Sequence, residues 1–347
     1  MTSPLLQTPT RFATLVTGGA GFLGRSLVES LASNAQHVTV VDDADLDLAL
    51  DPVGVAHGST RHVRADMRFL ADVMAPSAQR RFDTVVHLAG IVGVRRVLAE
   101  PERCRRANED LGRALLAWIA GLDADVRPRV FAASTSEVYC ASRHPLRESD
   151  AVHPVGAGRR WAYAASKIAC ERALDAAMLW PIERAPVHLR FFNVVGPGQD
   201  SRQGMMLPTF VEQALAGLPI TVHGDGSQVR TLAHVDDVAS TLRALIAHPC
   251  LPGGPLNIGG TARASVLEIA ECVLALSGSR AGIVHVDPLC TVGSNFEDIA
   301  WREPDLTKLC ALDVPVPARA LDEIVADTLA RHTELVRRRH ACASRAS

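Results

Sequence analysis

The stretch Thr17-Gly-Gly-Ala-Gly-Phe-Leu-Gly24 follows a run of small and β-branched residues and opens an amphipathic segment. Gly18 and Gly19 permit a tight turn, Gly21 lets the backbone approach a pyrophosphate, and Gly24 allows a helix to pack closely on a sheet. The N-terminus of the following helix offers free N–H groups to phosphates. Strand, glycines and helix in this order predict a dinucleotide-binding loop at the start of an α/β fold.

A pair of carboxylates follows the second expected strand. Val40-Val-Asp-Asp43 lies about twenty residues after the glycines, where an acid accepts a hydrogen bond from a ribose 2′-hydroxyl. Because a carboxylate repels a 2′-phosphate, the pattern favours NAD over NADP, with either Asp42 or Asp43 in this role. Asp66, after the third expected strand, is placed to meet the adenine amino group.

Short β-branched runs alternate with amphipathic stretches through the first half of the chain. Such alternation predicts βαβ units, and continuous apolar runs indicate strands that are covered on both faces. We therefore expect a Rossmann doubly wound parallel sheet in residues 12–192, with segments returning to it from the C-terminal half. The strands are expected at Ala13–Thr17, His37–Val41, His62–Ala65, Thr84–Leu88, Val130–Ala133 and Val187–Phe192. The helices are expected at Phe22–Ser33, Cys104–Gly121 and Ala164–Met178.

The pattern changes after Phe192, where a Gly- and Pro-rich stretch leads into shorter units. Residues 193–335 are expected to form a smaller α/β lobe that binds the substrate, and residues 336–347 a flexible tail. The units expected after Phe192 are helices at Pro208–Ala216, Asp236–Ala247 and Ser265–Leu276, and strands near Ile220–Val222 and Leu256–Ile258.

Tyr163 and Lys167 stand four residues apart, so on a helix they share one face. A phenol titrates near pH ~10, and a nearby cation favours the phenolate. The pair therefore predicts a base that takes a proton from a hydroxyl while a hydride leaves the same carbon. Ser134-Thr-Ser-Glu-Val-Tyr139, just upstream, adds hydroxyls and a carboxylate to the candidate site.

Composition argues against several classes of protein. The net charge of −2 and the 4 % aromatic content offer no basic, aromatic surface for nucleic acid. The eight cysteines are scattered without a C-x-x-C pair, which predicts a reducing compartment and neither disulfides nor a metal site. Since the sequence also shows no signal-peptide core and no long apolar run, we expect a soluble cytoplasmic protein without membrane contact.

Taken together, these stretches resemble the extended short-chain dehydrogenase/reductase family, which includes nucleotide-sugar epimerases, dehydratases and decarboxylases. The resemblance extends from Val16 to about Val325. Besides the glycine loop and the Tyr–Lys pair, its motifs are His87-Leu-Ala-Gly90, Ser134-Thr-Ser-Glu-Val-Tyr139, Arg190-Phe-Phe-Asn-Val-Val-Gly-Pro197, Gly224-Asp-Gly-Ser-Gln-Val-Arg230, His234-Val-Asp-Asp237, Asn257-Ile-Gly-Gly260 and Arg302-Glu-Pro-Asp305.

The resemblance implies a common first step. Tyr163 would act as the base, Thr135 would hydrogen-bond the sugar 4-hydroxyl, and Lys167 would hold the nicotinamide ribose and lower the pKa of Tyr163. Tightly bound NAD would take the C4 hydride and later return it, so that the 4-keto sugar is transient. The residues implied to bind the nucleotide diphosphate are Asn193, Arg230 and Arg302. The implied cofactor contacts are Gly18, Gly21, Phe22, Leu23, Gly24, Asp42, Asp43, Asp66, Met67, Leu88, Ala89, Gly90, Tyr163 and Lys167.

Ser136 and Glu137 are further candidate catalytic residues, because they bear on the fate of the ketone once it has formed. By frequency in the family, we expect first a 4-epimerase acting on a UDP-hexose or hexuronate. The Thr-Ser-Glu order that ends at Glu137 is similar to both GDP-mannose 4,6-dehydratases and UDP-glucuronate decarboxylases. Gly158-Arg-Arg-Trp-Ala-Tyr163 and Asn295-Phe-Glu-Asp-Ile-Ala-Trp-Arg302 are similar to a decarboxylase of this type, which is the close second expectation. Two roles stay open for each residue. Glu137 either acts on the sugar or orients the loop backbone. Arg302 either contacts the phosphates alone or contacts a substrate carboxylate as well.

Other outcomes stay open. A dehydratase ranks third, and an NAD-binding protein without turnover or a dehydrogenase that releases NADH ranks below it. UDP is the expected nucleotide, with GDP, CDP and dTDP as alternatives. The resemblance also implies a homodimer formed by helices Cys104–Gly121 and Ala164–Met178, although a helix that covers its own sheet carries the same apolar stripe. Cys140, where the family usually has Gly, is either a small buried residue or a thiol beside the sugar.

Overall fold

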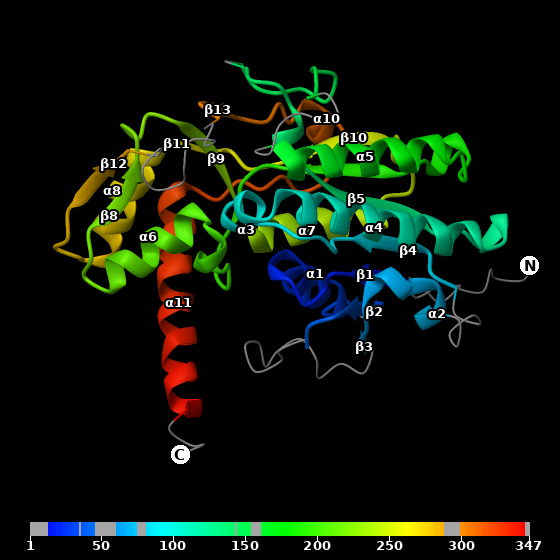
Figure 1. The fold of residues 1–347 in the computed structure, drawn as a ribbon, viewed down its shortest axis with the longest axis horizontal. Coiled ribbons are helices and arrows are strands. Elements are labelled where there is room, and N and C mark those ends of the chain that lie inside the picture. The colour runs from blue at the N-terminus through cyan, green and yellow to red at the C-terminus, as the bar shows by residue number, and fades with distance from the viewer. Residues whose placement is uncertain are drawn as a thin grey trace, which may run out of the picture.

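The structure is a computed structural model that describes residues 13–34, 36–45, 60–74, 81–142, 144–153, 161–287 and 299–343. Its largest element is a seven-stranded parallel sheet with strand order β10-β6-β5-β4-β1-β2-β3 (Figure 1). These strands are β1 Ala13–Thr17, β2 His37–Asp42, β3 Thr60–Arg64, β4 Thr84–His87, β5 Arg129–Thr135, β6 Val187–Phe191 and β10 Gly254–Ile258. The expected doubly wound α/β fold is confirmed.

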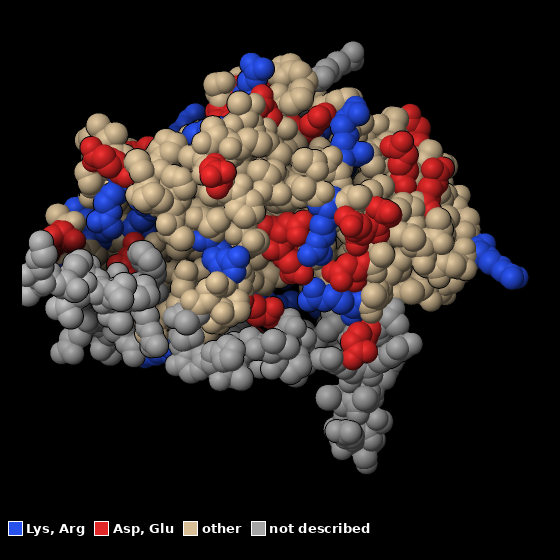
Figure 2. Space-filling view, turned by 180° about the vertical axis from the view of Figure 1, so that it is seen from behind, with Lys and Arg blue, Asp and Glu red and all other residues tan. Residues whose placement is uncertain are grey.

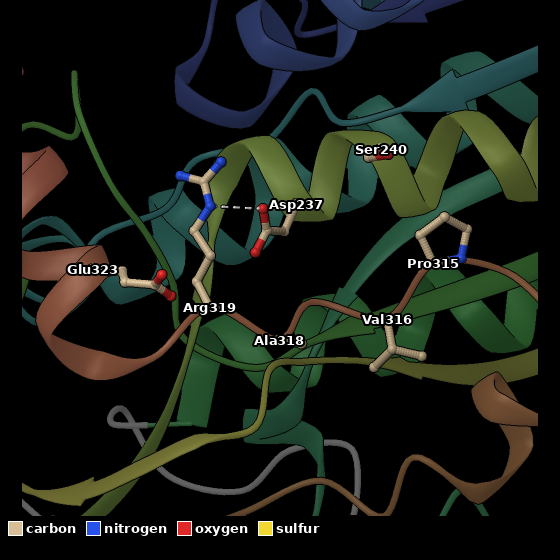
Figure 3. Close-up of a pocket in the computed structure, with 7 residues that line it drawn as sticks. All are labelled: Asp237, Ser240, Pro315, Val316, Ala318, Arg319 and Glu323. Atoms are coloured by element: carbon tan, nitrogen blue, oxygen red, sulfur yellow. Dashed lines mark ion pairs between the residues drawn. The ribbon is translucent and has the colours of Figure 1, made fainter.

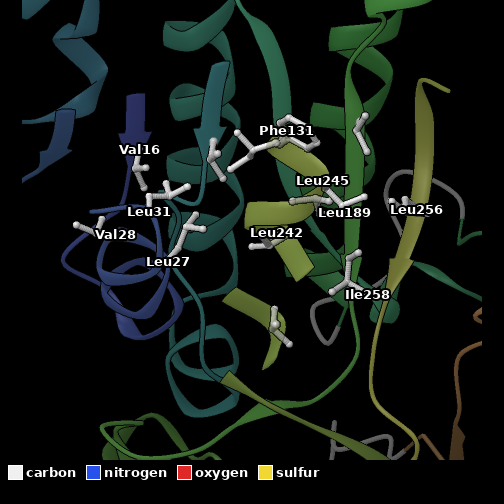
Figure 4. Packing of buried hydrophobic residues seen from close by; sticks show 14 of the residues in the cluster. Val16, Leu27, Val28, Leu31, Phe131, Leu189, Leu242, Leu245, Leu256 and Ile258 are labelled. Atoms are coloured by element: carbon white, nitrogen blue, oxygen red, sulfur yellow. The ribbon is translucent and has the colours of Figure 1, made fainter. Parts of the chain in front are cut away.

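Helices cover both faces of this sheet. Because side chains alternate along a strand, neighbours such as Leu15 and Val16 enter different cores, one on each side. One face is covered by α1 Phe22–Ala32 and α7 Val235–Ala247, whose leucines pack on Val16, Phe131 and Leu189 (Figure 4). The other face is covered by α2 Leu70–Met74, α4 Pro101–Ala120 and α5 Ala162–Ala176. A short helix, α3 Val94–Ala99, precedes α4.

Two elements expected after Phe192 are part of the large domain and not of the smaller lobe: one is a strand of its sheet, and the other is a helix that covers the sheet. Strand β10 pairs in parallel with β6 as the seventh strand, and α7 packs beside α1. These two elements are thus the segments from the C-terminal half that join the large sheet and cover it. Their apolar content was visible in the sequence, but a short apolar run does not reveal which sheet it joins.

The smaller lobe surrounds a separate core (Figure 1). Its central strand β9 Val229–His234 pairs with β7, β11 and β13, and β8 pairs with β12. The remaining elements of the lobe are β7 Val194–Val195, α6 Met206–Leu215, β8 Ile220–His223, β11 Ala262–Ser265, α8 Val266–Ser277, β12 Ile283–Val286, β13 Trp301–Arg302 and α11 Leu321–Ala343. A further short helix, α10 Thr307–Cys310, packs against β10 of the large sheet.

Helix α11 continues through residues 336–343 of the stretch expected as a tail, and the flexibility of that stretch stays a prediction. The sequence from Leu321 onward is rich in Leu, Ala, Glu and Arg, which have high helix propensity, and it contains no Gly or Pro. Strand β3 also differs, since it spans Thr60–Arg64 where His62–Ala65 was expected. Among the described residues, no helix has the length and apolarity needed to cross a bilayer.

The strand order predicts where a ligand binds on the sheet. The chain progresses outward from β1 in one direction through β2 and β3, and from β4 in the other through β5 and β6. In such sheets ligands bind outside the carboxyl ends of the strands, where the order reverses. On the face seen in Figure 2, acidic and basic side chains lie interleaved among the described residues, as the balanced composition predicts.

Candidate active site

The glycine loop lies at the carboxyl end of β1 in close contact with the loop that follows β4. Gly18 has a φ of +75°, and a Cβ there would lie 2.5 Å from the backbone nitrogen of Ala89. A Cβ on Gly24 would lie 2.3 Å from the carbonyl oxygen of Gly18. Gly21 precedes the first turn of α1, and its N–H donates to the Gly18 oxygen at 3.2 Å. The loop is thus folded against the start of the helix, as the glycine spacing predicts.

Asp42 and Asp43 have different surroundings. The Asp42 carboxylate accepts hydrogen bonds from the backbone N–H groups of Ala20, at 2.9 Å, and Ala44, at 3.0 Å. Asp43 is exposed. Since only Asp42 contacts the glycine loop, Asp42 is the carboxylate placed beside a dinucleotide on that loop.

Asp66 caps the short turn that contains Met67, which is buried. Its carboxylate accepts from the backbone N–H of Arg68 at 2.9 Å and from the Arg68 guanidinium at 2.5 Å. These contacts, the hydrogen bond to the Arg68 side chain first, lower the pKa of Asp66. The carboxylate expected to meet adenine is therefore ionised and paired.

The segment after β4 joins the glycine loop to the catalytic pair. The Leu88 N–H donates to the Thr17 carbonyl oxygen at 2.9 Å, and Nδ1 of His87 lies 2.8 Å from the Thr17 hydroxyl. Burial first, and then the charge of Lys167, lower the pKa of His87 to about 3. A Cβ on Gly90 would lie 3.3 Å from Nζ of Lys167. Residues 87–90 therefore run from the cofactor loop to the lysine.

Tyr163 and Lys167 share the first turns of α5, as predicted. Nζ of Lys167 lies 5.8 Å from the centre of the Tyr163 ring, and Lys167 is only 5 % exposed. Asn108 on α4 fixes this helix, because its amide donates to the Ser166 hydroxyl at 3.2 Å while its oxygen accepts from the Ile91 N–H at 2.7 Å. The Ser166 hydroxyl donates in turn to the Tyr163 carbonyl oxygen at 2.7 Å.

The electrostatics of Tyr163 differ from the expectation that Lys167 lowers its pKa. Burial raises the pKa of Tyr163, the charges of Glu137 and Cys104 raise it further, and Arg302 opposes them. Burial likewise lowers the pKa of Lys167. The loss of water around the phenol outweighs the cations nearby, so the protein side chains alone favour the neutral phenol.

Thr135 ends β5, and Ser136 and Glu137, which follow it, contact Arg302 from the smaller lobe. Nη2 of Arg302 donates to the Ser136 hydroxyl at 2.6 Å, and Nη1 lies 3.5 Å from a Glu137 carboxylate oxygen. The side chains of Arg302 and Glu137 are only 13 % and 14 % exposed. The Thr135 hydroxyl accepts from the Glu137 N–H at 3.2 Å. The charges of Glu137 and Arg302 shift the pKa of Tyr163 in opposite directions, Glu137 upward and Arg302 downward.

Asn193 and Arg230 lie on the lobe side of the site. Strand pairing sets Arg230 directly beside Arg302, and Nη1 of Arg230 donates to the Ile299 carbonyl oxygen at 2.6 Å. The Asn193 amide donates to the Thr231 carbonyl oxygen at 3.2 Å. Both side chains are therefore held by the backbone of the lobe, and their contact with a diphosphate stays a prediction.

Some parts of the expected site lie elsewhere or were missed. Residues 158–160 and 295–298 of the decarboxylase-like stretches lie outside the described residues. Asn108 and Ser166 were not foreseen, although a buried polar residue on an apolar helix stripe is a usable signal.

A groove of about 360 Å³ lies beside α7, away from this site, and an Arg319–Asp237 ion pair of 3.0 Å crosses it (Figure 3). None of the candidate catalytic residues lines it.

The residues around the glycine loop fit a dinucleotide. Side chains at Gly18 or Gly24 would collide with backbone, so these positions require glycine. No side chain from them covers the main chain beside the N-terminus of α1. Asp42 places a carboxylate against the Ala20 N–H of the loop, and Lys167 places a buried amine beside Gly90, while their contacts with the two riboses stay predictions.

Comparison with known proteins agrees with this geometry. The model of the NAD dependent epimerase/dehydratase family matches residues 14–259. The chain is 31 % identical over 311 residues to UDP-N-acetyl-alpha-D-glucosaminuronate decarboxylase of Bacillus cytotoxicus, covering 85 % of this chain and 89 % of that protein. It is 29 % identical over 328 residues to the uncharacterized UDP-glucose epimerase YtcB of Bacillus subtilis, covering 91 % and 96 %. Among solved structures it is similar to TunA, an NAD-dependent NDP-hexosamine 5,6-dehydratase of tunicamycin biosynthesis, with a TM-score of 0.74, 28 % identity and coverage of 92 % and 97 %.

Proposed function

The chain belongs to the NAD-dependent epimerase/dehydratase family, and we propose that it decarboxylates a UDP-hexuronate through a transient 4-keto sugar. That it is an NAD-dependent enzyme of the nucleotide-sugar epimerase, decarboxylase and dehydratase group follows from this membership and from its relatives. The choice of decarboxylation within that group is the proposal, and it reverses the order of preference expected from the sequence alone.

The observation that carries the proposal is the position of Arg302. Its guanidinium contacts Ser136 and Glu137 beside the Tyr163 phenol. A neutral hexose has no group that needs a buried arginine there, whereas a hexuronate carries its carboxylate on C5, next to the C4 that is oxidised. A planar guanidinium binds such a carboxylate in a fork of two hydrogen bonds. The 31 % identity with a decarboxylase of a UDP-hexuronate supports the same choice.

The side chains have separate tasks in this reaction. Tyr163 takes the proton of the C4 hydroxyl and Thr135 hydrogen-bonds the same oxygen, while the charge of Lys167, 5.8 Å from the ring centre, opposes the burial that disfavours the phenolate. Once C4 is a carbonyl, the C5–C6 bond breaks, carbon dioxide leaves, and the electron pair moves onto the C4 oxygen as an enolate. Glu137 relays a proton from solvent to C5 in place of carbon dioxide, and Tyr163 returns its proton to the C4 oxygen when the ketone is reduced to a hydroxyl. The net change is hexuronate plus one proton to pentose and carbon dioxide.

The residues below would hold NAD, which would supply a reversible hydride acceptor for C4, so the overall reaction needs no other oxidant. The residues that we assign to hold it are the glycine loop from Gly18 to Gly24, Asp42 at the adenosine ribose and Lys167 at the nicotinamide ribose. Leu88, Ala89 and Gly90 line the path between them, since they join the loop to Lys167.

A 4-epimerase is the second candidate, supported by the 29 % identity with a protein named as a UDP-glucose epimerase. The Glu137–Arg302 contact is compatible with an epimerase when the two side chains only orient each other and the loop after β5. In that case the C4 ketone would be reduced from its other face, with C5 unchanged. A hexuronate 4-epimerase would also use Arg302, so the products decide between the two.

The test is mass spectrometry of products after incubation with NAD and, separately, UDP-glucuronate, UDP-N-acetylglucosaminuronate, UDP-glucose and UDP-N-acetylglucosamine. Decarboxylation predicts loss of carbon dioxide from one of the hexuronates. A new isomer of unchanged mass would refute it in favour of epimerisation, and loss of water would favour a dehydratase.

Variants of Arg302 sharpen the assignment. In Arg302→Gln, decarboxylation is expected to fall by a factor of about 10² or more, because a charged hydrogen-bonded pair with the substrate is lost. The matched control is Arg263→Gln, since Arg263 stacks on Trp301, the neighbour of Arg302, but pairs with Glu303 and not with Glu137. Equal losses of decarboxylation activity in the two variants would contradict the role of Arg302.

A further inference from the structure

A buried ion pair lies between the large sheet and α5, directly behind the catalytic pair. Glu171 on α5 accepts from Nη2 of Arg190 at 2.7 Å and from Nε at 3.1 Å, and the Ser134 hydroxyl donates to it at 2.5 Å. The side chains of Arg190 and Glu171 are 6 % and 10 % exposed. The carboxylate thus has three donors, from two strands of the sheet, and almost no water.

Stability does not explain this arrangement well. Replacing a buried ion pair with well-packed apolar residues is often neutral or stabilising, because two charges must be taken out of water to form the pair. The location of the pair is more informative. Glu171 is one helical turn beyond Lys167 on the same helix, and Ser134 immediately precedes Thr135. Residues four apart on a helix are neighbours on its surface.

Among the described ionisable groups that act on Lys167, Glu171 is the one that carries a negative charge. The groups that act on Lys167 are Cys170 and Glu171 from α5, Cys104 from α4 and His87 from the end of β4. Burial raises the pKa of both thiols and lowers that of His87, so all three are neutral near pH 7. Glu171 is the anion that remains. Tyr163 is faced by Glu137, Cys104 and Arg302.

Arg190 does not cancel this effect at Lys167. Its guanidinium lies over the Tyr139 ring, 4.8 Å from the centre, and it comes from a strand, β6, on the opposite side of the Glu171 carboxylate from α5. The ion pair therefore presents its negative end to Lys167 and its positive end to β6 and Tyr139.

We propose that Glu171 is a positioning residue that keeps Lys167 protonated beside Tyr163, and that Arg190 and Ser134 hold its carboxylate for this purpose. The inference rests on the proposed role of Lys167 as the cation of the base. It assigns to Glu171 no contact with substrate or cofactor.

The chain offers a direct measurement, because Lys167 and Lys308 are its only lysines. In protein labelled with ¹³C at lysine Cε, NMR should show two lysine signals, and Lys308→Arg identifies the one from Lys167. The pH titration of that signal reports the protonation of Lys167 in the folded protein, with and without NAD, and needs no turnover.

Three variants should move this titration in different ways. In Glu171→Gln the anion is lost and Arg190 is unpaired, so the acid dissociation constant of Lys167 is expected to rise roughly tenfold, the lower end of the effect of a charge within about 4–6 Å. In Arg190→Met the anion is uncompensated, so the constant should fall. Ser134→Ala changes no charge and should leave it within about twofold.

A purely structural ion pair predicts that Glu171→Gln and Arg190→Met lose stability alike and shift Lys167 in the same direction or not at all, which would overturn the proposal. If a single variant does not fold, Glu171→Gln/Arg190→Met removes both charges. A higher acid dissociation constant of Lys167 in that double variant supports the proposal, and an unchanged one refutes it. Because no substrate is involved, these outcomes are independent of whether a hexuronate loses carbon dioxide.

Discussion

Gly18→Ala tests whether the glycine loop is shaped by contact with the segment after β4. The new Cβ would lie 2.5 Å from the Ala89 nitrogen, 2.7 Å from its Cα and 2.8 Å from the Leu88 carbonyl carbon, at a φ of +75°. The left-handed backbone costs about 1–2 kcal/mol for a residue with a Cβ, and overpacking against backbone adds about 1–3 kcal/mol. We therefore expect a total loss of about 2–5 kcal/mol. At this chain length that corresponds to a fall in Tm of roughly 3–7 °C.

The matched control is Gly217→Ala, because Gly217 has a similar φ of +68° with nothing within 4 Å of the added Cβ. It carries the backbone cost without the collision, so its Tm should fall by only about 1–3 °C. Thermal unfolding followed by circular dichroism measures both, and calorimetric titration with NAD measures binding. Gly18→Ala should weaken NAD binding, since Leu88 and Ala89 must shift, whereas Gly217→Ala should not. Equal destabilisation of the two variants, or full NAD affinity in Gly18→Ala, would refute the reasoning.

Other predictions concern the base, the buried histidine and the assembly. Tyr163→Phe should lower turnover by a factor of about 10²–10⁴, the usual worth of a general base, while calorimetry still detects NAD binding; undiminished turnover would exclude the phenol as the base. His87 has a folded pKa of about 3, below its ordinary 6.5, so the stability it contributes is present above pH 6.5 and is lost as the pH falls toward 3. The free energy of unfolding therefore falls by up to about 1.4 kcal/mol per pH unit on acidification. Urea unfolding at several pH values should therefore show a shallower acid slope in His87→Gln, and an identical slope would contradict the burial of neutral His87. Sedimentation at micromolar concentration should give twice the mass of one chain if α4 and α5 form a homodimer, and a single-chain mass would remove that expectation.

Local sequence patterns predicted the parts of the site that depend on spacing. The glycine loop, the carboxylate after β2 and the Tyr163–Lys167 pair each lie within one turn or one strand–helix junction, so the backbone geometry follows from the residues themselves. Asp42 could be separated from Asp43 only with coordinates, because the choice depends on which carboxylate faces the Ala20 N–H.

Long-range contacts and burial could not be predicted in this way. Arg302 and Ser136 are 166 positions apart in the sequence, and only the resemblance suggested that Arg302 reaches the sugar end of the site. The pKa of Tyr163 was expected to be lowered because a neighbouring lysine was visible in the sequence, but the burial that raises it was not. For the same reason the pairing of Glu171 with Arg190, 19 positions apart, was not predicted from the sequence.

The seventh strand has a consequence for any attempt to divide this protein. Strand β10 and α7 come from beyond the start of the smaller lobe, yet they complete the large sheet and one of its covering layers. A fragment ending at Phe192 would leave β6 with a free row of backbone donors and acceptors on one side, which is a template for aggregation. It would also uncover apolar side chains of α1. Exchanging the lobe with that of a relative thus requires several cuts on both sides of α7 and β10, so the two parts have to evolve, and be engineered, as one interwoven unit.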